Sequence, residues 1–358
     1  MENSALDENA RLAKANWLRI DPGRLRDFIA GHKEVRSVDI VDVQYPAAGA
    51  GSSNGIALLC ANIDVGAGAE RRQLVVRYAP GRTLIKQKSF TDEFLTGRAV
   101  HAAGLPAAAP LWIDSQGDRL GVKGYVMERT FGDVPAAGMF SEGLLARASP
   151  SDRNAMMLEA VGFHGHLRRS SLGAEQVPHL VARGTGNTPL ERELRWWMTE
   201  AEQSSGPGEP KLARIRSAFT WLLEHQPAVL RPAILVHGDS QFSNLMFRDG
   251  KVVAALDWEL AYLGHGEADL ALMVWMTEIQ MQFAGNVVDA PSEQDYILRY
   301  ETESGCLIEH WEYFRMFLLY KMVSVLMASA TTMPSFDEFW ELNWAELERS
   351  WQRLRARR

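Results

Sequence analysis

The sequence predicts an α+β fold with two lobes, a small β-rich N-terminal lobe and a larger, mainly helical C-terminal lobe. Short runs rich in valine, isoleucine and leucine recur between residues 38 and 127, and such runs are typical of strands. After about residue 130, apolar residues follow i, i+3, i+4 spacing, which is typical of helices. A chain of 358 residues is also long enough for more than one core. We place the lobes at residues 1–128 and 129–358.

The N-terminal lobe is predicted to hold a leading helix, three antiparallel strands, an inserted helix and two further strands. The leading helix follows Asp21, with Pro22 at its first position, where proline is favoured. Glycine and small residues separate the first two strands, as a turn requires. The predicted strands are residues 38–45, 56–63, 74–78, 111–113 and 124–127, and the inserted helix is residues 90–103.

The C-terminal lobe is predicted to be helical, with one island of strand at residues 232–257. Loops rich in glycine, proline and serine interrupt the helical pattern at residues 183–189 and 204–210. The predicted helices are residues 153–169, 190–203, 211–226, 267–283 and 292–329.

Charge and hydropathy restrict the partners of the chain. Its formal charge is −7, from 38 basic and 45 acidic residues, whereas non-specific binding to nucleic acid needs a basic surface. No apolar run approaches the ~20 residues of a membrane-spanning helix. The first twenty residues include Glu2, Asp7 and Glu8 and lack the apolar segment of a signal peptide. We therefore expect a cytoplasmic protein that binds neither nucleic acid nor membrane.

The most informative segment is residues 234–259, where polar residues follow an apolar run in a fixed order. The tripeptide from His237 to Asp239 comes first, and Asn244 follows five residues after the aspartate. Each of these residues alone is explained by a loop, because Asp, Asn and Gly favour turns. Their occurrence together, in this order, indicates a functional site.

A hairpin places the polar residues of this segment close together. Asp249-Gly250 is a strong signal for a two-residue turn, so the chain returns close to its starting point. Asn244 heads the outgoing strand, Asp257 ends the returning strand, and Asp239 lies in the loop before them. Magnesium prefers oxygen ligands, few of them from protein when phosphates complete the octahedron. Asn244 and Asp257 meet that need, and Asp239 can accept or orient the proton of an attacking hydroxyl.

The motif HGD-x4-N, followed by a strand that ends in DWE, resembles the signature of the aminoglycoside phosphotransferase and choline kinase family. Members of this family have the bilobal fold of protein kinases. The resemblance is greatest to the kinase-like domain of certain acyl-CoA dehydrogenase fusion proteins. It implies an ATP-dependent or GTP-dependent phosphotransferase with an alcohol group as acceptor. By the same resemblance Asp239 is the catalytic base, and Asn244 and Asp257 bind Mg²⁺.

The resemblance also assigns residues of the N-terminal lobe to the nucleotide. The loop that contains Gly51, Ser52, Ser53 and Asn54 lies between the first two strands, where the family wraps the triphosphate. Backbone N–H groups of such a loop can bind phosphate oxygens, although a plain Gly/Ser hairpin turn explains the run equally well.

Arg77 occupies the position in the third strand where protein kinases carry lysine. A guanidinium group can hold phosphates with two hydrogen bonds, and a buried cation needs a partner. Glu93, on the following helix, is the best candidate for that partner. The alternative is an ordinary edge-strand arginine and a solvated glutamate.

At the join between the lobes, the resemblance implies that the carbonyl of Glu128 and the amide of Thr130 bind adenine. Asp269, at the start of an apolar helix, corresponds to the aspartate that braces the catalytic loop. A plain N-cap explains Asp269 nearly as well. We assign Asp269 and His237 to structural support.

The acceptor is predicted to be a small, fairly apolar hydroxylated compound or a hydroxyacyl thioester. A polycationic aminoglycoside would require a dense cluster of carboxylates, and the nearest approach to one is Glu278, Asp289, Glu293 and Asp295. The alternatives are an aminoglycoside-type antibiotic phosphotransferase, a nucleotide-binding pseudokinase, and a metallohydrolase that uses His237, Asp239 and Asp257.

Overall fold

The computed structural model describes two compact units within the chain. The first consists of Met1–Leu84, Ser89–Arg98 and Ala108–Thr130, and the second of Ile85–Lys88, Ala99–Ala107 and Phe131–Arg358. The division into lobes at residue 128 stays a prediction. The residues that the structure describes are 19–46, 54–79, 85–206, 208–285, 289–329 and 336–356.

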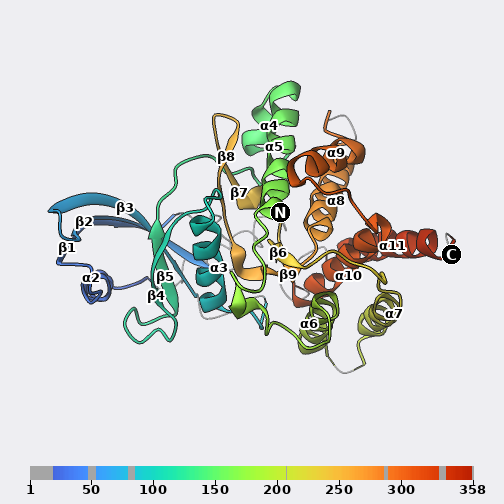
Figure 1. Ribbon diagram of the computed structural model, residues 1–358, viewed down its shortest axis with the longest axis horizontal. Helices are drawn as coiled ribbons and strands as arrows, with labels where there is room; N and C mark the ends of the chain where they lie inside the picture. Colours follow the sequence, from blue (N-terminus) through green and yellow to red (C-terminus); the bar gives the residue numbers. More distant parts are fainter. Residues whose placement is uncertain are drawn as a thin grey trace, which may run out of the picture. The chain divides into compact units, whose positions relative to one another are not determined.

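The first unit contains a five-stranded antiparallel sheet (Figure 1). The strand order is β1-β2-β3-β5-β4, so the three consecutive strands and the later strand pair predicted from the sequence form a single sheet. The predicted α+β class with an antiparallel β-rich unit is confirmed. The strands are β1 (Ser37–Gln44), β2 (Gly55–Asp64), β3 (Ala69–Tyr78), β4 (Pro110–Asp114) and β5 (Gly124–Glu128).

Two helices cover the two faces of this sheet. Successive strand side chains point to opposite faces, and in β5 Val126 packs with α2 (Pro22–Ala30) whereas Tyr125 packs with α3 (Phe90–Ala102). The α2 helix begins as predicted, with the Asp21 side chain accepting a hydrogen bond from the Arg24 amide at 2.8 Å. The same alternation in β3 directs Val76 to the α2 face and Arg77 to the face covered by α3.

The second unit is mainly helical and holds two short antiparallel strand pairs. Strand β6 (Ile234–Val236) pairs with β9 (Tyr262–Gly264), and β7 (Leu245–Arg248) pairs with β8 (Lys251–Ala255). The helices are α4 (Gly143–Arg147), α5 (Pro150–Arg169), α6 (Pro189–Ser204), α7 (Pro210–Glu224), α8 (Glu267–Phe283), α9 (Glu293–Ser304), α10 (Trp311–Ser329) and α11 (Phe336–Ala356).

The pattern predicted as one helix over residues 292–329 forms two helices in the structure. A capping box of Ser292 and Asp295 starts α9, and Gly305 ends it in a left-handed conformation with φ 70°. His310, with φ 54°, precedes α10. Glycine adopts positive φ at no steric cost and is the usual residue after a helix C-terminus. The apolar periodicity therefore continues across a break that the glycine marks.

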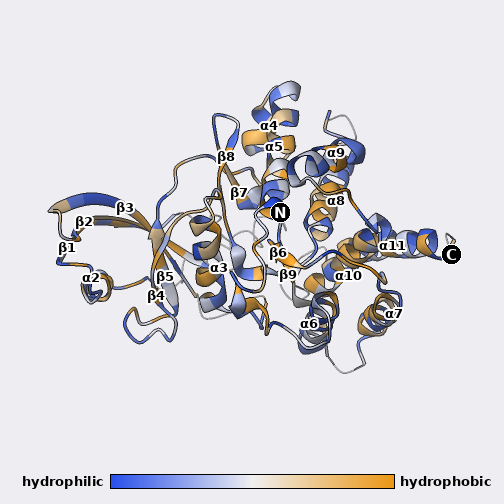
Figure 2. Cartoon of the chain, in the orientation of Figure 1, coloured by the Kyte–Doolittle hydropathy of each residue, from blue (hydrophilic) through white to orange (hydrophobic). Residues whose placement is uncertain are grey.

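Apolar side chains of the second unit form two cores. One joins α6, α7, α8, α10 and α11, and the other joins α5, α8 and α9 with strands β6 to β8. Helices α8 and α10 are coloured as mostly hydrophobic in Figure 2, consistent with their central places in these cores. Trp197 and Tyr320 are fully buried in the first of these cores.

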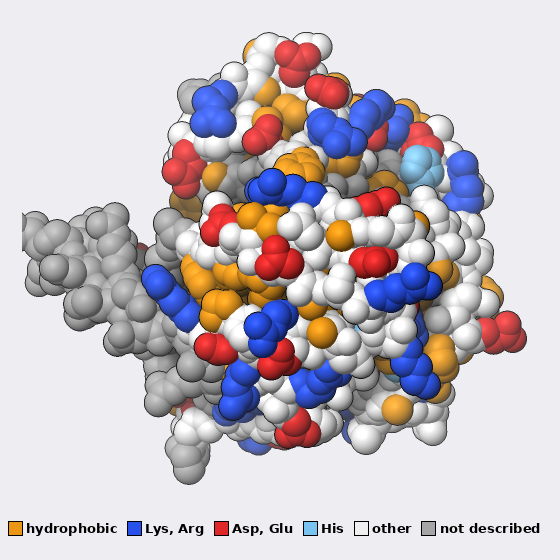
Figure 3. Space-filling view, turned by 90° about the vertical axis from the view of Figure 1, so that its left-hand side faces the viewer, with side chains coloured by type: hydrophobic (Ala, Val, Ile, Leu, Met, Phe, Trp, Pro, Cys, Tyr) orange, Lys and Arg blue, Asp and Glu red, His pale blue; other side chains and the backbone are white. Residues whose placement is uncertain are grey.

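Charges of both signs are interspersed on the face of the molecule drawn in Figure 3. Within the described part of the chain, no helix has both the length and the apolar character needed to cross a membrane.

Candidate active site

The predicted hairpin forms and brings its two ends together. Asp249 and Gly250 have φ angles of 53° and 73°, the positive values that a two-residue hairpin turn requires. At the open end, the Leu256 amide donates to the Asn244 carbonyl at 2.8 Å. Asn244 and Asp257 are therefore neighbours across the hairpin, as the sequence predicts.

Asp239 lies against Asn244. The Asn244 side-chain amide donates to the Asp239 carboxylate at 2.8 Å and to the Asp239 carbonyl at 2.9 Å. Gln241 donates to the other carboxylate oxygen at 2.7 Å. Burial raises the pKa of Asp239, against the opposing effects of Gln241, Lys321 and Asn244. A carboxylate that is more basic than free aspartate is a better proton acceptor.

The hydrogen bonds of Asn244 indicate which of its atoms can bind a cation. Its Nδ2 donates to Asp239 twice, and this leaves the oxygen Oδ1 as the atom for a metal ligand. Asp257 is half-buried and adopts a left-handed backbone conformation with φ 63°, which is uncommon for a residue other than glycine and is concentrated at functional sites. One amide oxygen and one carboxylate fit a Mg²⁺ ion whose remaining ligands come from phosphate and water.

Asp269 holds the loop that carries Asp239. Its carboxylate accepts from the His237 amide at 2.8 Å and from the Gly238 amide at 3.0 Å, and its carbonyl accepts from the Ser240 hydroxyl at 2.7 Å. Burial would raise the pKa of Asp269, but hydrogen bonds and nearby histidines outweigh burial and lower it. The N-cap of α8 is Gly266 rather than Asp269. The Asp269 side chain thus contacts the loop and does not cap its own helix.

His237 is buried and uncharged at neutral pH. Its Nε2 donates to the Leu256 carbonyl at 2.9 Å, and its Nδ1 accepts from the Asp239 amide at 3.3 Å. Burial lowers the pKa of His237 to about 4. The imidazole therefore links the loop that carries Asp239 to the end of the hairpin.

Gly238 allows this loop to pass close to a neighbouring chain segment. Its φ is +81°, and a Cβ at this position would lie 2.1 Å from the Leu260 carbonyl oxygen. Both the backbone conformation and the available space therefore require glycine.

In the first unit, the ion pair predicted between Arg77 and Glu93 is present. Arg77 Nε lies 2.6 Å from Glu93 Oε1, and the two side chains are only 10% and 2% exposed. The Tyr125 hydroxyl also donates to Glu93, at 3.0 Å. An ordinary edge-strand arginine and a solvated glutamate do not describe this pair. Its role toward a nucleotide stays a prediction.

The other predicted nucleotide-binding residues are placed only in part. Asn54 directly precedes β2 and is 2% exposed, whereas Gly51, Ser52 and Ser53 lie outside the described residues. The Glu128 amide bonds the Ala109 carbonyl at 2.9 Å, and Thr130 follows the end of β5. Binding of adenine by the Glu128 carbonyl and the Thr130 amide stays a prediction.

Several residues that lie around this loop are not predicted from the sequence. Gln241 lies inside the HGD-x4-N motif, so its contact with the Asp239 carboxylate is local in the sequence. Lys321 donates to the Gly238 carbonyl. In the sequence, Lys321 stands out only as a single lysine within an apolar helix. Lys88 pairs with Glu259 of the DWE motif at 2.9 Å, with both side chains buried.

The metallohydrolase alternative requires a cluster of metal-binding side chains. Within the described ranges, no group of three or more His, Cys, Asp or Glu side chains is placed to hold a metal ion. His237 bonds only backbone groups through its ring nitrogens. The described geometry therefore offers no support for a histidine-ligated metal.

Solved structures with a similar fold include several small-molecule kinases. An ethanolamine kinase from Plasmodium vivax superposes with a TM-score of 0.58 at 10% identity, over 87% of this chain and 81% of its own. The choline kinase LicA from Streptococcus pneumoniae gives 0.56 at 13% identity, over 91% and 98%. A Ralstonia eutropha protein described as a candidate aminoglycoside phosphotransferase gives 0.65 at 20% identity, over 92% and 99%. The predicted kinase-like fold is confirmed.

Curated proteins with similar sequences are much longer than this chain. Acyl-CoA dehydrogenase family member 11 of Rattus norvegicus is 26% identical over 261 residues, which are 69% of this chain and 32% of that protein. The probable acyl-CoA dehydrogenase IBR3 of Arabidopsis thaliana is 24% identical over 284 residues, which are 74% and 34%. This chain thus spans about a third of the length of these relatives.

The family assignment follows from a match over most of the chain. The model of the phosphotransferase enzyme family known as APH matches residues 62–300. This range includes Arg77, Glu93 and the whole HGD-to-DWE segment. The chain belongs to the APH phosphotransferase enzyme family.

Proposed function

We propose that this protein is an ATP-dependent kinase that transfers the γ-phosphate to a hydroxyl group of a small molecule, with Mg²⁺ as cofactor. The observation that carries the proposal is the arrangement at the hairpin. Asp239 is held by Asn244, and Asn244 adjoins Asp257 across the hairpin end. Membership in the phosphotransferase family supports it.

The proposed reaction is a direct, in-line transfer without a phosphoenzyme. The acceptor oxygen forms a bond to the γ-phosphorus while the bond to the β–γ bridging oxygen breaks. Asp239 accepts the hydroxyl proton, and Asn244 fixes the carboxylate that receives it. Bound Mg²⁺, held by Asn244 Oδ1 and Asp257, would neutralise charge on the phosphates.

In the first unit, we propose that Arg77 binds the phosphates of ATP or GTP. Its pairing with Glu93 at 2.6 Å orients the guanidinium, so less conformational freedom is lost when a phosphate binds. Residues 51–54 would contribute backbone N–H groups to the phosphates. Glu128 and Thr130 would bind the base through backbone groups.

The acceptor is proposed to be a fairly apolar hydroxylated compound or a hydroxyacyl thioester. Among the four acidic residues nearest to a cluster, Glu278 and Glu293 both pair with Arg315, and Asp295 caps α9. Carboxylates that are already engaged offer less to a polycation. The names of the curated relatives refer to acyl-CoA, which makes hydroxyacyl thioesters the first acceptors to test.

An aminoglycoside-type activity is the alternative acceptor class. Structures of similar fold include an aminoglycoside phosphotransferase bound to hygromycin B, at 13% identity and a TM-score of 0.53. A nucleotide-binding pseudokinase is a further alternative. The presence of Asp239, Asn244 and Asp257 in one place argues against it, because loss of any one of them would stop transfer.

The test is a phosphorylation assay with MgATP and a panel of acceptors, read by mass spectrometry. The panel contains hydroxyacyl thioesters, simple alcohols, choline, ethanolamine and aminoglycosides. We expect a phosphorylated product from the first two classes and none from Asp239→Asn. A thermal shift with MgATP but no product from any acceptor would favour the pseudokinase, and turnover of aminoglycosides alone would overturn the proposed acceptor class.

A further inference from the structure

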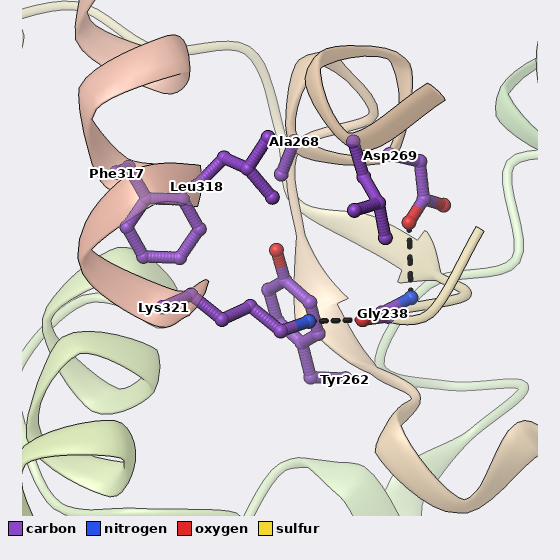
Figure 4. Close-up of a pocket in the computed structure, with 8 residues that line it drawn as sticks. Gly238, Tyr262, Ala268, Asp269, Phe317, Leu318 and Lys321 are labelled. Carbon is purple, nitrogen blue, oxygen red and sulfur yellow. Dashed lines mark hydrogen bonds between the residues drawn. The ribbon is translucent and has the colours of Figure 1, made fainter. Parts of the chain in front are cut away.

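Lys321 is a buried lysine that the proposed reaction does not use. It lies on α10 with only 5% of its surface exposed, among apolar neighbours that include Phe317 and Leu318 (Figure 4). Lysine is almost never fully buried unless its ammonium group is bound, because removing a charge from water is costly. Such a residue therefore needs a physical explanation.

The ammonium group of Lys321 bonds the backbone next to Asp239. Its Nζ donates to the Gly238 carbonyl oxygen, the contact drawn in Figure 4. This carbonyl belongs to the peptide unit that joins Gly238 to Asp239. The amide end of the same unit donates to His237 Nδ1 at 3.3 Å. Lys321 and His237 thus hold the two ends of the peptide that carries the proposed base.

The surroundings of Lys321 stabilise its position without an ion pair. The rings of Trp197 and Tyr262 have their centroids 5.1 and 5.9 Å from Nζ, within the range of a cation–π contact. No ion pair among the described residues includes Lys321. The nearby carboxylate of Glu193 is occupied, since it accepts from Trp197 Nε1 at 2.7 Å and from Arg183 Nε at 3.1 Å.

The pocket beside Lys321 is too small for a substrate. It has a volume of about 10 Å³, which is roughly the room that one water molecule needs. Its lining includes Gly238, Tyr262, Phe317 and Lys321. A direct contact between an acceptor and the ammonium group through this pocket is therefore excluded by size.

We propose that Lys321 is a positioning residue for phosphoryl transfer, which fixes the Gly238–Asp239 peptide and thereby aims the Asp239 carboxylate. This inference rests on the proposed function. The bond to Gly238 leaves the direction of the next residue little freedom, and a misplacement of about 1 Å in a reacting group can cost ~100-fold in rate. Stability alone does not explain a buried charge at this position, because apolar residues often stabilise such sites better.

The first test needs no acceptor and measures hydrogen exchange of the amides of residues 237–239. Lys321→Met removes the charge and the donor at similar length, and Lys321→Arg keeps both. Ser324→Ala is the matched control, since the buried Ser324 hydroxyl donates within its own helix, to the Tyr320 carbonyl at 2.8 Å. We expect exchange at least 10-fold faster in Lys321→Met, close to the wild-type rate in Lys321→Arg, and unchanged in Ser324→Ala.

The second test separates turnover from nucleotide binding. Lys321→Met is expected to lower kcat by 10- to 100-fold and to leave the KM for ATP within about 3-fold, with partial recovery of kcat in Lys321→Arg. If Lys321→Met does not fold, Lys321→Gln takes its place in the comparison of kcat with the KM for ATP. Glutamine removes the charge and keeps N–H donors on a shorter chain.

Two results would overturn the inference. One is wild-type exchange and wild-type kcat in Lys321→Met, and the other is an equal loss of kcat and ATP affinity, which indicates general damage. If the wild type phosphorylates nothing, the proposed function fails by itself, whereas the exchange experiment still decides whether Lys321 fixes the loop.

Discussion

Two buried cations, one in each unit, are held in different ways. Arg77 in the sheet of the first unit pairs with the carboxylate of Glu93. Lys321 in the second unit bonds the neutral carbonyl of Gly238 and lies near two aromatic rings. The first arrangement neutralises a charge, whereas the second uses a charge to hold a backbone group.

We expect the ion pair to contribute mainly to the free energy of unfolding and the Lys321 contact mainly to the geometry of the loop. Removing one partner of a buried ion pair leaves the other charge poorly compensated, which costs about 3–5 kcal/mol. Replacing Lys321 removes the charge itself and leaves the Gly238 carbonyl without its donor, which costs about 1–3 kcal/mol. It also takes a positive charge away from the nearby carboxylates of Glu193, Asp239 and Asp269. Changes at Arg77 or Glu93 should therefore lower the free energy of unfolding, whereas changes at Lys321 should act mainly on the catalytic loop.

Asp239→Asn is expected to have the largest effect, a loss of kcat by ~10³-fold or more with little change in the affinity for MgATP. Asparagine keeps the size of the side chain but cannot accept the proton. Steady-state kinetics and titration calorimetry with MgATP measure the two quantities. A rate loss no larger than that of Lys321→Met would contradict the assignment of Asp239 as the base.

Glu93→Ala is expected to lower the free energy of unfolding by about 3 kcal/mol and to raise the KM for ATP. The variant removes the carboxylate that lies 2.6 Å from Arg77, so the buried guanidinium loses its compensating charge. Urea denaturation measures the first effect. The double variant Arg77→Met/Glu93→Leu is the control: it should recover much of the stability but not the affinity for ATP, and equal losses in both variants would sink the ion-pair explanation.

The same two regions show what a sequence can predict. Arg77 and Glu93 lie on a strand and the next helix, and the resemblance to the kinase-like family, rather than the periodicity alone, predicts that they pair. Asn244 and Asp257 come together through a turn signal inside one short segment. In the hairpin the geometry is local, and the turn signal predicts it directly.

The partners of the catalytic loop are remote. Lys321 lies 83 positions from the carbonyl that it binds, and Asp269 lies 32 and 31 positions from the amides of His237 and Gly238. The apolar periodicity predicts that Lys321 lies on an apolar helix, but it does not predict which loop packs against that helix. Packing between helices and loops decides this contact, and the resemblance to a family supplied Asp269 but not Lys321.

Acid is expected to destabilise the protein through buried histidines that stay neutral when folded. Burial lowers the pKa of His265 to about 4, with Arg168 and His310 adding repulsion. The unfolded chain binds this proton near pH 6.5, so stability is lost as pH falls from about 6.5 to about 4. The loss from one such group is about 3 kcal/mol.

Urea denaturation at several pH values tests this, with His265→Gln as the comparison. The variant should lose less stability over the same pH range, while the slope that remains comes from groups such as His237, whose pKa is also lowered to about 4. An unchanged slope in His265→Gln would show that His265 does not contribute.

Gly238→Ala tests whether loop geometry matters apart from any charge. The added methyl group would lie 2.1 Å from the Leu260 carbonyl oxygen at a residue with φ +81°. Gly285→Ala is the matched control, because Gly285 has φ +72° and nothing lies within 4 Å of its Cβ position. Both variants pay the backbone strain of positive φ, about 1 kcal/mol, but only Gly238→Ala must also move the chain at Leu260.

We expect Gly238→Ala to be less stable than Gly285→Ala by about 1–2 kcal/mol and to lose kcat, while Gly285→Ala keeps the wild-type kcat. Urea denaturation and steady-state kinetics give both values. Because neither change alters a charge, a loss of kcat confined to Gly238→Ala would show that the path of the loop controls the rate. It would also explain why a cation is buried beside this loop: the carbonyl of Gly238 has to stay where Lys321 holds it.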